Sequence, residues 1–198
     1  MIERLPARAF AAGVVTLALV SGVVSYLMVQ PDPAVDTTRV TAAPAEVAAS
    51  ASAPSLVTAA GLEQFRRDYR DRFGDTLLDE ATLHDEYASI ERAVPHSPDR
   101  VMPYSYRGTF ESDHSPTTRP VGTPEFDLDA LDVPLLARYL AGAPQSVGVP
   151  DGSVSHVGLG IDVGEATVSI YVSNRAQENG YLVLTPDGRV LAVRRFEP

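Results

Sequence analysis

The sequence contains no cysteine and no lysine, and all 16 of its basic residues are arginine. Without cysteine the chain forms no disulfide, holds no thiolate nucleophile and offers no cysteine-based metal site. Arginine in place of lysine, together with abundant alanine, valine, proline and aspartate, is typical of a GC-rich bacterial genome. These absences narrow the chemistry that the chain supports and leave its cellular compartment open.

Positive charge is also scarce: 16 basic residues stand against 26 acidic ones, which gives the 198 residues a formal net charge of −10. Proteins that bind nucleic acid neutralise phosphates with basic side chains, so this balance argues against a nucleic-acid partner. Once the flanking segments are removed, the chain is long enough for one ordinary domain with a single core.

Residues 9–29 contain no charged side chain. About 21 helical residues span roughly 30 Å, the thickness of the bilayer hydrocarbon. Arg4 and Arg8 precede the run, whereas Asp32 and Asp36 follow it. By the positive-inside rule, we predict a cytoplasmic tail at 1–8 and a transmembrane signal-anchor helix at 9–29, with the remaining chain extracytoplasmic. A cleaved signal peptide is the alternative, but the run is long and no small-x-small site directly follows it; the alanine-rich stretch 41–53 could be cut but lies well downstream.

Two further predictions concern the first 60 residues. Ala18 and Gly22 form a small-xxx-small pair that would allow two membrane helices to approach as a weak homodimer. Residues 30–60 are rich in alanine, proline, serine and threonine and show neither a helical nor a strand period. Such a composition predicts a disordered linker that holds the domain at 61–198 away from the membrane.

Helical spacing predicts three helices in the domain. Leu62, Phe65, Tyr69 and Phe73 mark the first, with Gly74 as its stop. A second is expected through residues 83–94. The third begins at the cap Asp132, presents the apolar residues 135, 136, 139 and 140, and ends at Gly142.

Strand patterns dominate the remaining domain. One strand is expected within 101–112, and four more within 153–161, 166–174, 180–185 and 189–196. Leu182, Leu184, Leu191 and Val193 are expected to share a buried face. Short connections make neighbours antiparallel. The predicted class is therefore α+β, with helices packed on a curved antiparallel sheet that ends in a strand meander.

This layout is similar to two known kinds of domain. One is the cone-shaped nuclear-transport-factor-like domain found on single-pass accessory subunits of bacterial secretion and lipid-import machines. The other is the small PepSY-type module, whose strand meander ends in a D-G-x-V hairpin, as at Asp187, Gly188 and Val190 here. Both resemblances imply an extracytoplasmic accessory role and concern layout alone.

The stretch from Gly160 to Gly164 resembles the phosphate-binding opening of the actin-like ATPase and sugar-kinase superfamily. Glu165 stands where that superfamily usually has a small hydroxyl residue, and only 34 residues follow Gly164. A turn between two strands accounts for the same residues, since Asp and Gly favour turns. We therefore predict a hairpin without a nucleotide.

Four other groups of residues contain side chains that could form a metal site, a catalytic site or a binding surface. For each group, a simpler structural role accounts for the same residues. Glu80 and His84, four apart on the expected second helix, are two metal ligands of the three or four that zinc needs. Ser153, Ser155 and His156 lack the sequence context of a catalytic triad. Asp127, Asp129 and Asp132 suggest calcium, yet fit a strand followed by a cap. Arg189, Arg194 and Arg195 form a basic end that suits an exposed edge strand protected by charge, or a contact with a partner or anionic lipid. We predict no metal, no cofactor and no catalytic residue.

The segment 104–110 is the most site-like surface stretch. Tyr104, Tyr106, Arg107 and Phe110 are residue types enriched at interface hot spots, and we predict that they bind a partner. The alternating pattern would equally bury these aromatic rings in the sheet. The favoured function is a non-enzymatic accessory or scaffold protein that binds another envelope protein. A small-ligand binder or sensor, using a concavity between helices and sheet, and an envelope enzyme remain open alternatives.

Overall fold

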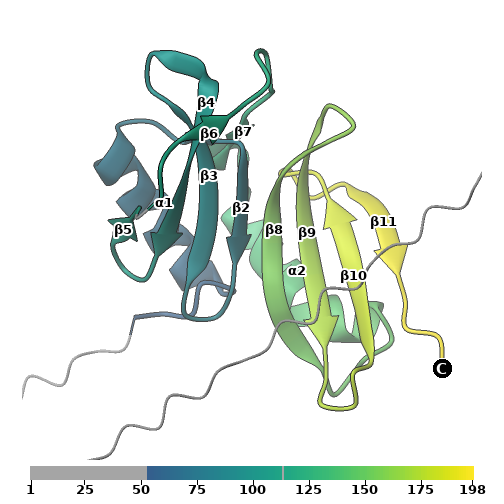
Figure 1. Ribbon diagram of the computed structural model, residues 1–198. Helices are drawn as coiled ribbons and strands as arrows, with labels where there is room; N and C mark the ends of the chain where they lie inside the picture. Colours follow the sequence, from purple (N-terminus) through teal and green to yellow (C-terminus); the bar gives the residue numbers. More distant parts are fainter. Residues whose placement is uncertain (1–52, 113) are drawn as a thin grey trace, which may run out of the picture. The chain divides into compact units, whose positions relative to one another are not determined.

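Figure 1 shows the computed structural model, which describes residues 53–112 and 114–198. These residues form mostly antiparallel sheet with two α-helices, which confirms the predicted α+β class. The elements, in chain order, are α1 (Ala59–Phe73), β1 (Leu77–Leu78), β2 (Glu80–Leu83), β3 (Ala88–Val94), β4 (Ser97–Tyr106), β5 (Phe110–Glu111), β6 (Thr117–Thr118), β7 (Phe126–Asp127), the 3-10 helix η1 (Leu128–Ala130), α2 (Val133–Ser146), β8 (Ser153–Asp162), β9 (Glu165–Ser173), β10 (Asn179–Leu184) and β11 (Val190–Arg194).

Nine strands form one sheet, in the order β11-β10-β9-β8-β2-β3-β4-β5, with β6 paired to β4. β1 and β7 form a separate two-stranded ribbon. The sheet joins two antiparallel meanders, because β2 of the first pairs with β8 of the second. α2 lies between them in the chain, and Figure 1 shows both helices behind the strands. One face of the sheet is therefore covered by helices, and we call the opposite face the open face.

Strand alternation separates these two faces. Every second side chain of the central strands points toward the helices and is buried, as Leu83, Ile90, Val157 and Ile170 illustrate. These residues and the apolar sides of both helices form one hydrophobic core. The space between helices and sheet, where the sequence suggested a concavity, is thus filled by packed side chains.

The first helix has the predicted stop, because Gly74 adopts φ 80° and its N–H donates to the carbonyl of Arg70. Its start lies before the predicted domain boundary. Thr58 caps the helix by accepting a hydrogen bond from the Gly61 N–H. Leu56 is 5% exposed, and its N–H donates to the carbonyl of Asp85 at 2.9 Å. Packed structure therefore begins inside the segment predicted as linker, whose earlier part lies outside the described residues.

The second predicted helix, at 83–94, is wrong. β2 and β3 form an antiparallel hairpin there, closed by a hydrogen bond from the His84 N–H to the carbonyl of Tyr87 at 2.8 Å. The apolar spacing fitted a helix, but pairing of β2 with β8 and of β3 with β4 buries Ala81, Leu83 and Ile90 against the helices. Long-range strand pairing has overridden the local period.

The third helix starts as predicted, with Asp132 accepting a hydrogen bond from the Leu135 N–H. The prediction that it ends at Gly142 is wrong, because α2 continues to Ser146 and contains Pro144. The carbonyl of Gly142 accepts a hydrogen bond from the Ser146 hydroxyl. Ala143 and Val147 are fully buried, so core packing extends the helix beyond a glycine that the sequence suggested as its end.

The C-terminal meander is confirmed in number, order and direction of strands. Leu182 and Leu184 are buried as expected. Leu191 and Val193 are not buried as expected, since Leu191 is half-buried and Val193 is 46% exposed. The reason is position, because β11 pairs with β10 alone and forms one edge of the sheet.

Within the described residues, no helix has the length and apolar character needed to cross a bilayer. The predicted transmembrane segment at 9–29 lies outside the described residues, as do Ala18 and Gly22.

Candidate functional site

A row of half-buried polar rings crosses the open face. Tyr87 and His84 stand at the hairpin of β2 and β3, and the row continues through β8, β9 and β10. We call this the ring row, and its members are Tyr87, His84, His156, Tyr171 and Tyr181. Arg107, in the turn after β4, extends it with its guanidinium 4.8 Å from the Tyr87 ring centroid.

Ring spacing shows that the row is ordered. Centroids lie 4.4 Å apart for His84–Tyr87 and 4.2 Å apart for His156–Tyr171, with interplanar angles of 15° and 13°. The His84–His156 and Tyr171–Tyr181 pairs are 5.4 and 5.5 Å apart and more tilted. Stacked faces leave ring edges, with their hydroxyl and imidazole groups, directed away from neighbouring rings. The row therefore presents polar groups on a rigid support.

His156 is the electrostatically perturbed member of the row. Burial lowers its pKa, and the nearby His84 lowers it further, because protonating both imidazoles would place like charges side by side. The Ser155 hydroxyl lies 3.1 Å from Nδ1 of His156 and also donates to the carbonyl of Tyr171 at 3.3 Å. The lowered pKa favours the neutral form of His156.

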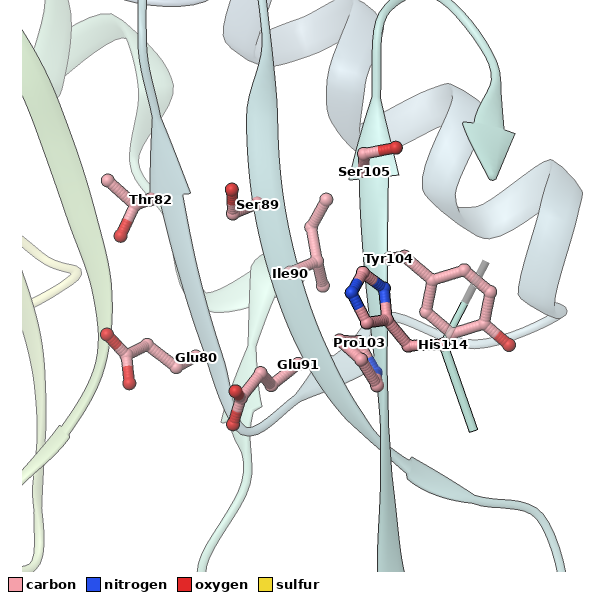
Figure 2. Close-up of a pocket in the computed structure, with 9 residues that line it drawn as sticks. All are labelled: Glu80, Thr82, Ser89, Ile90, Glu91, Pro103, Tyr104, Ser105 and His114. Carbon is pink, nitrogen blue, oxygen red and sulfur yellow. The ribbon is translucent and has the colours of Figure 1, made fainter. Parts of the chain in front are cut away.

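Two adjoining hollows lie beside the ring row. One, of about 270 Å³, is lined by residues of β2, β3 and β4 and by His114, and Figure 2 shows it with Glu80 and Glu91 side by side. The other, of about 320 Å³, continues over β8 and β9. Both are lined by Glu80 and Thr82, so they adjoin each other on the surface of five neighbouring strands. We call the two hollows together the open-face trough.

The strand register defines the floor and the edge of the trough. Its floor is a register row of small side chains, namely Ser105, Ser89, Thr82, Gly158 and Ser169. The next row along the strands places Glu91 directly opposite Glu80, followed by Gly160 and Thr167. The ring row bounds the other side. Hydroxyl groups, two carboxylates and ring edges therefore surround an uncovered backbone surface.

Neither glycine in the trough is needed by the backbone or by packing. Gly158 and Gly160 are absent from the positions with positive φ. A Cβ at Gly158 would lie 3.7 Å from the Ser169 Cβ, and one at Gly160 would lie 3.6 Å from the Asp79 carbonyl oxygen, both ordinary contacts. Glycine inside an element costs about 0.5–1 kcal/mol relative to alanine. Such residues often mark close approach of a ligand or another backbone.

Arg119 holds the segment after β6 against the start of β2. Its side chain is 5% exposed and binds the Asp79 carboxylate through Nε at 2.6 Å and a second nitrogen at 2.7 Å. It also donates to the carbonyls of Pro98 and Thr123 at 3.0 Å. This bidentate pair fixes one end of the trough, because Asp79 lines the second hollow.

The predicted partner-binding residues are brought together, but mostly in the interior. Tyr106 is 2% exposed and its hydroxyl donates to Asp68 at 2.5 Å. Burial and this hydrogen bond raise the pKa of Tyr106 well above its usual range. Tyr104 and Phe110 are half-buried and pack against Phe73 of α1. Arg107 alone is exposed, so alternation has turned three of the four inward; their partner-binding role stays a prediction.

The stretch resembling a phosphate loop is a hairpin. Asp162 pairs with Glu165, and the two intervening residues, Val163 and Gly164, adopt φ 48° and 81°. Two consecutive positive φ values are typical of a type I′ turn. Val163 is fully exposed at its tip.

The other candidate sites have structural explanations. Glu80 begins strand β2 and His84 directly follows its end, so the two residues stand roughly 13 Å apart along extended backbone and cannot share an ion. Asp127 accepts hydrogen bonds from the Thr76 hydroxyl and the Asp129 N–H, while Asp129 pairs with Arg70. Asp132 caps α2. Among the described residues, no group of three or more His, Asp or Glu side chains is arranged to hold a metal.

The structure also shows the surroundings of the suggested catalytic triad and of the basic end. Of the triad residues, Ser155 and His156 are in contact, whereas no hydrogen bond joins the His156 ring to a carboxylate among the described residues. In the basic end, Arg189 pairs with Glu165, while Arg194 and Arg195 are exposed at and just after β11.

Sequence reasoning missed the ring row and the trough. The signal was alternation, because His156, Gly158 and Gly160 occupy every second position of one expected strand, and Thr167, Ser169 and Tyr171 do so in the next. Glu80 and His84 belong to the same face of the sheet, but the helix prediction for their segment placed them outside any strand.

No protein family model matches the chain. It is 30% identical over 137 residues to an uncharacterized protein of Mycobacterium tuberculosis strain CDC 1551, and 31% identical over 137 residues to one of strain H37Rv. Each alignment covers 66% of this chain and 47% of the relative. The chain thus spans about half the length of the curated relatives it matches.

One solved structure, of a candidate lipoprotein from Clostridium difficile 630, aligns with a TM-score of 0.46 and 14% identity. The alignment covers 64% of this chain and 86% of that one. Similarity at this level does not establish a shared fold.

Proposed function

We propose that this chain is a membrane-anchored, extracytoplasmic accessory or scaffold protein that binds another cell-envelope protein through the open face of its sheet. The observation that carries the proposal is the ring row beside the open-face trough. Tyrosine and arginine are enriched at interface hot spots, and rings already held by their neighbours lose little conformational entropy on binding. A broad surface with shallow hollows suits a protein partner better than one small molecule.

The predicted anchor supports the location. An uncharged run at 9–29, preceded by arginines, would leave the folded residues outside the cytoplasm. The natural absence of cysteine allows a direct topology test with single-cysteine variants. A membrane-impermeant maleimide applied to intact cells should label Thr117→Cys, which is exposed, and should leave Glu3→Cys unlabelled until the cells are opened. The reverse pattern, or a chain that lacks residues 9–29 after maturation, would remove the anchor from the proposal.

Site-specific photo-crosslinking tests the binding face. A benzophenone amino acid is placed at Tyr171 in the ring row or, as a control, at Arg138 on the exposed side of α2. In membranes of cells that naturally make the protein, the Tyr171 position should give an adduct of discrete mass that mass spectrometry identifies as an envelope protein. The Arg138 position should not. No adduct at Tyr171, or the same adducts from both positions, would contradict the proposal.

A further inference from the structure

We infer that the partner contributes an extended, arginine- or lysine-bearing polypeptide segment, which lies in the open-face trough with its cationic groups against Glu80 and Glu91. This inference rests on the proposed function, because it names the chemistry of that partner. It draws on the shape of the trough, its bare floor and its charge.

Shape favours an extended chain. The trough runs across five neighbouring strands from β4 to β9, which at strand spacing is about 19 Å. An extended polypeptide of about six residues covers that distance. The two hollows adjoin at Glu80 and Thr82, so one segment laid across these residues can contact both.

The floor allows another backbone to come close. A Cβ at Gly158 would make only ordinary contacts, yet the residue carries no side chain. In the sheet register it lies between Thr82 of β2 and Ser169 of β9. Hydroxyl groups on both sides of this gap can bond the amides of a segment laid over it. The stacked rings of the ring row leave hydroxyl and imidazole groups along one margin for the same purpose.

Charge selects a cationic segment. Glu80 and Glu91 are exposed cross-strand partners, and neither has an ion-pair partner in the described part of the chain. Like charges directly opposite each other in a sheet are unfavourable. A guanidinium or ammonium group placed between the two carboxylates relieves this repulsion, which a neutral glycan would leave in place.

The test uses the full chain in mild detergent and two peptides that carry fluorescein on the N-terminal amine, TRTRTR-NH2 and the matched TETETE-NH2, with binding followed by fluorescence anisotropy. The arginine peptide should bind and the glutamate peptide should not. The double variant Glu80→Gln, Glu91→Gln should weaken binding of the arginine peptide by tenfold or more. Asp71→Asn with Glu197→Gln makes the same change in net charge on exposed residues outside the trough, and should weaken it by less than threefold.

Filling the floor gives a second, uncharged test. Gly158→Val places a strand-favouring side chain where space exists, so thermal unfolding should occur at or above the wild-type temperature while the arginine peptide loses affinity by tenfold or more. If affinity survives in Gly158→Val and in the double glutamine variant, the inference is wrong. Specific binding of cellohexaose in place of the arginine peptide would make the trough a glycan site and would also overturn it.

The two proposals fail separately. If photo-crosslinking from Tyr171 captures a partner whose capture is unaffected by Gly158→Val and by the glutamine variants, the open face binds a partner of different chemistry and only this inference fails. If Tyr171 captures nothing, the proposed function itself fails.

Discussion

Two groups of aromatic rings lie on opposite faces of one sheet, and they differ in what surrounds them. On the covered face, rings of α1, β4 and β5 pack at varied angles into the core, namely Phe65, Tyr69, Phe73, Tyr104, Tyr106 and Phe110. The hydroxyl groups of Tyr69 and Tyr106 find partners inside the chain, since Tyr69 donates to the carbonyl of Leu77 and Tyr106 donates to the carboxylate of Asp68, both at 2.5 Å. On the open face, the ring row is stacked in near-parallel pairs with its edges free of covering elements.

This difference shows that residue type alone does not identify a binding surface. Tyrosines of the segment predicted to bind a partner became core, whereas the functional candidate arose from rings distributed over four separate stretches of the chain. Covered rings stabilise the fold, while the ring row holds its geometry without being needed for the core. Substitutions should therefore affect stability on one face and binding on the other.

The largest effect should come from Phe65→Ala. The Phe65 ring is 1% exposed and contacts the rings of Tyr69, Tyr106 and Phe110. Truncating a buried phenylalanine costs about 3–5 kcal/mol in unfolding free energy. Chemical denaturation measured by circular dichroism should show this loss; a loss below about 1 kcal/mol would mean that the covered rings do not form the core.

Next in size is Arg119→Met, which contrasts a buried charge pair with the exposed carboxylates of the trough. The variant leaves Asp79, whose side chain is 11% exposed, without its partner. Breaking a buried pair from one side costs about 3–5 kcal/mol, whereas Glu91→Gln should change the unfolding free energy by less than about 0.5 kcal/mol. Equal effects in the two denaturation curves would contradict the distinction.

Tyr171→Ala should separate binding from stability. The ring is half-buried and stacks on His156, so its loss should lower the unfolding free energy by about 1 kcal/mol. Co-purification of the partner from native membranes should nevertheless be abolished. A stability loss as large as that of Phe65→Ala would place Tyr171 in the core instead, and retained co-purification would exclude the ring row from the interface.

The smallest effect should be a pH dependence centred on His156. Its folded pKa is lowered, so the unfolded chain binds more protons and stability rises with pH in this window. The contribution is fully present above the unfolded value of about 6.5 and falls as the pH drops toward the folded pKa. His156→Gln should flatten this part of the stability curve, whereas His84→Gln should retain most of it, because burial is the larger cause. An NMR titration of the imidazole that gives a pKa above 6.5 would reverse the sign.

Local signals sufficed for much of the fold. Gly74 and Asp132 were predicted as helix boundaries because capping needs only neighbouring residues. The C-terminal strands were predicted because apolar and polar residues alternate, and because the turns at Asp187–Gly188 and Val163–Gly164 have local sequence signatures. At Val163–Gly164, the hairpin turn accounts for the residues that resemble a phosphate loop.

Features that depend on contacts between distant parts of the chain could not be predicted from local sequence signals. The hairpin of β2 and β3 looked helical because its apolar spacing fits a period near 3.6, and only pairing with β8 decides the matter. Gly142 looked like a helix end because the buried Ala143 beyond it could not be foreseen. Val193 looked buried because alternation does not reveal that its strand is an edge.

The sequence by itself determined the composition, the charge, the α+β class, the helix boundaries at Gly74 and Asp132 and the C-terminal strands, since these depend on residues within a few positions of one another. Tertiary structure alone decided which side of each strand the helices would cover. That choice buried Tyr106, placed Tyr171 half-buried on the open face, and aligned Glu80 with Glu91 and His84 with His156. The physical reason is that a binding face is a register of several strands, and register is fixed by pairing between segments far apart in the chain.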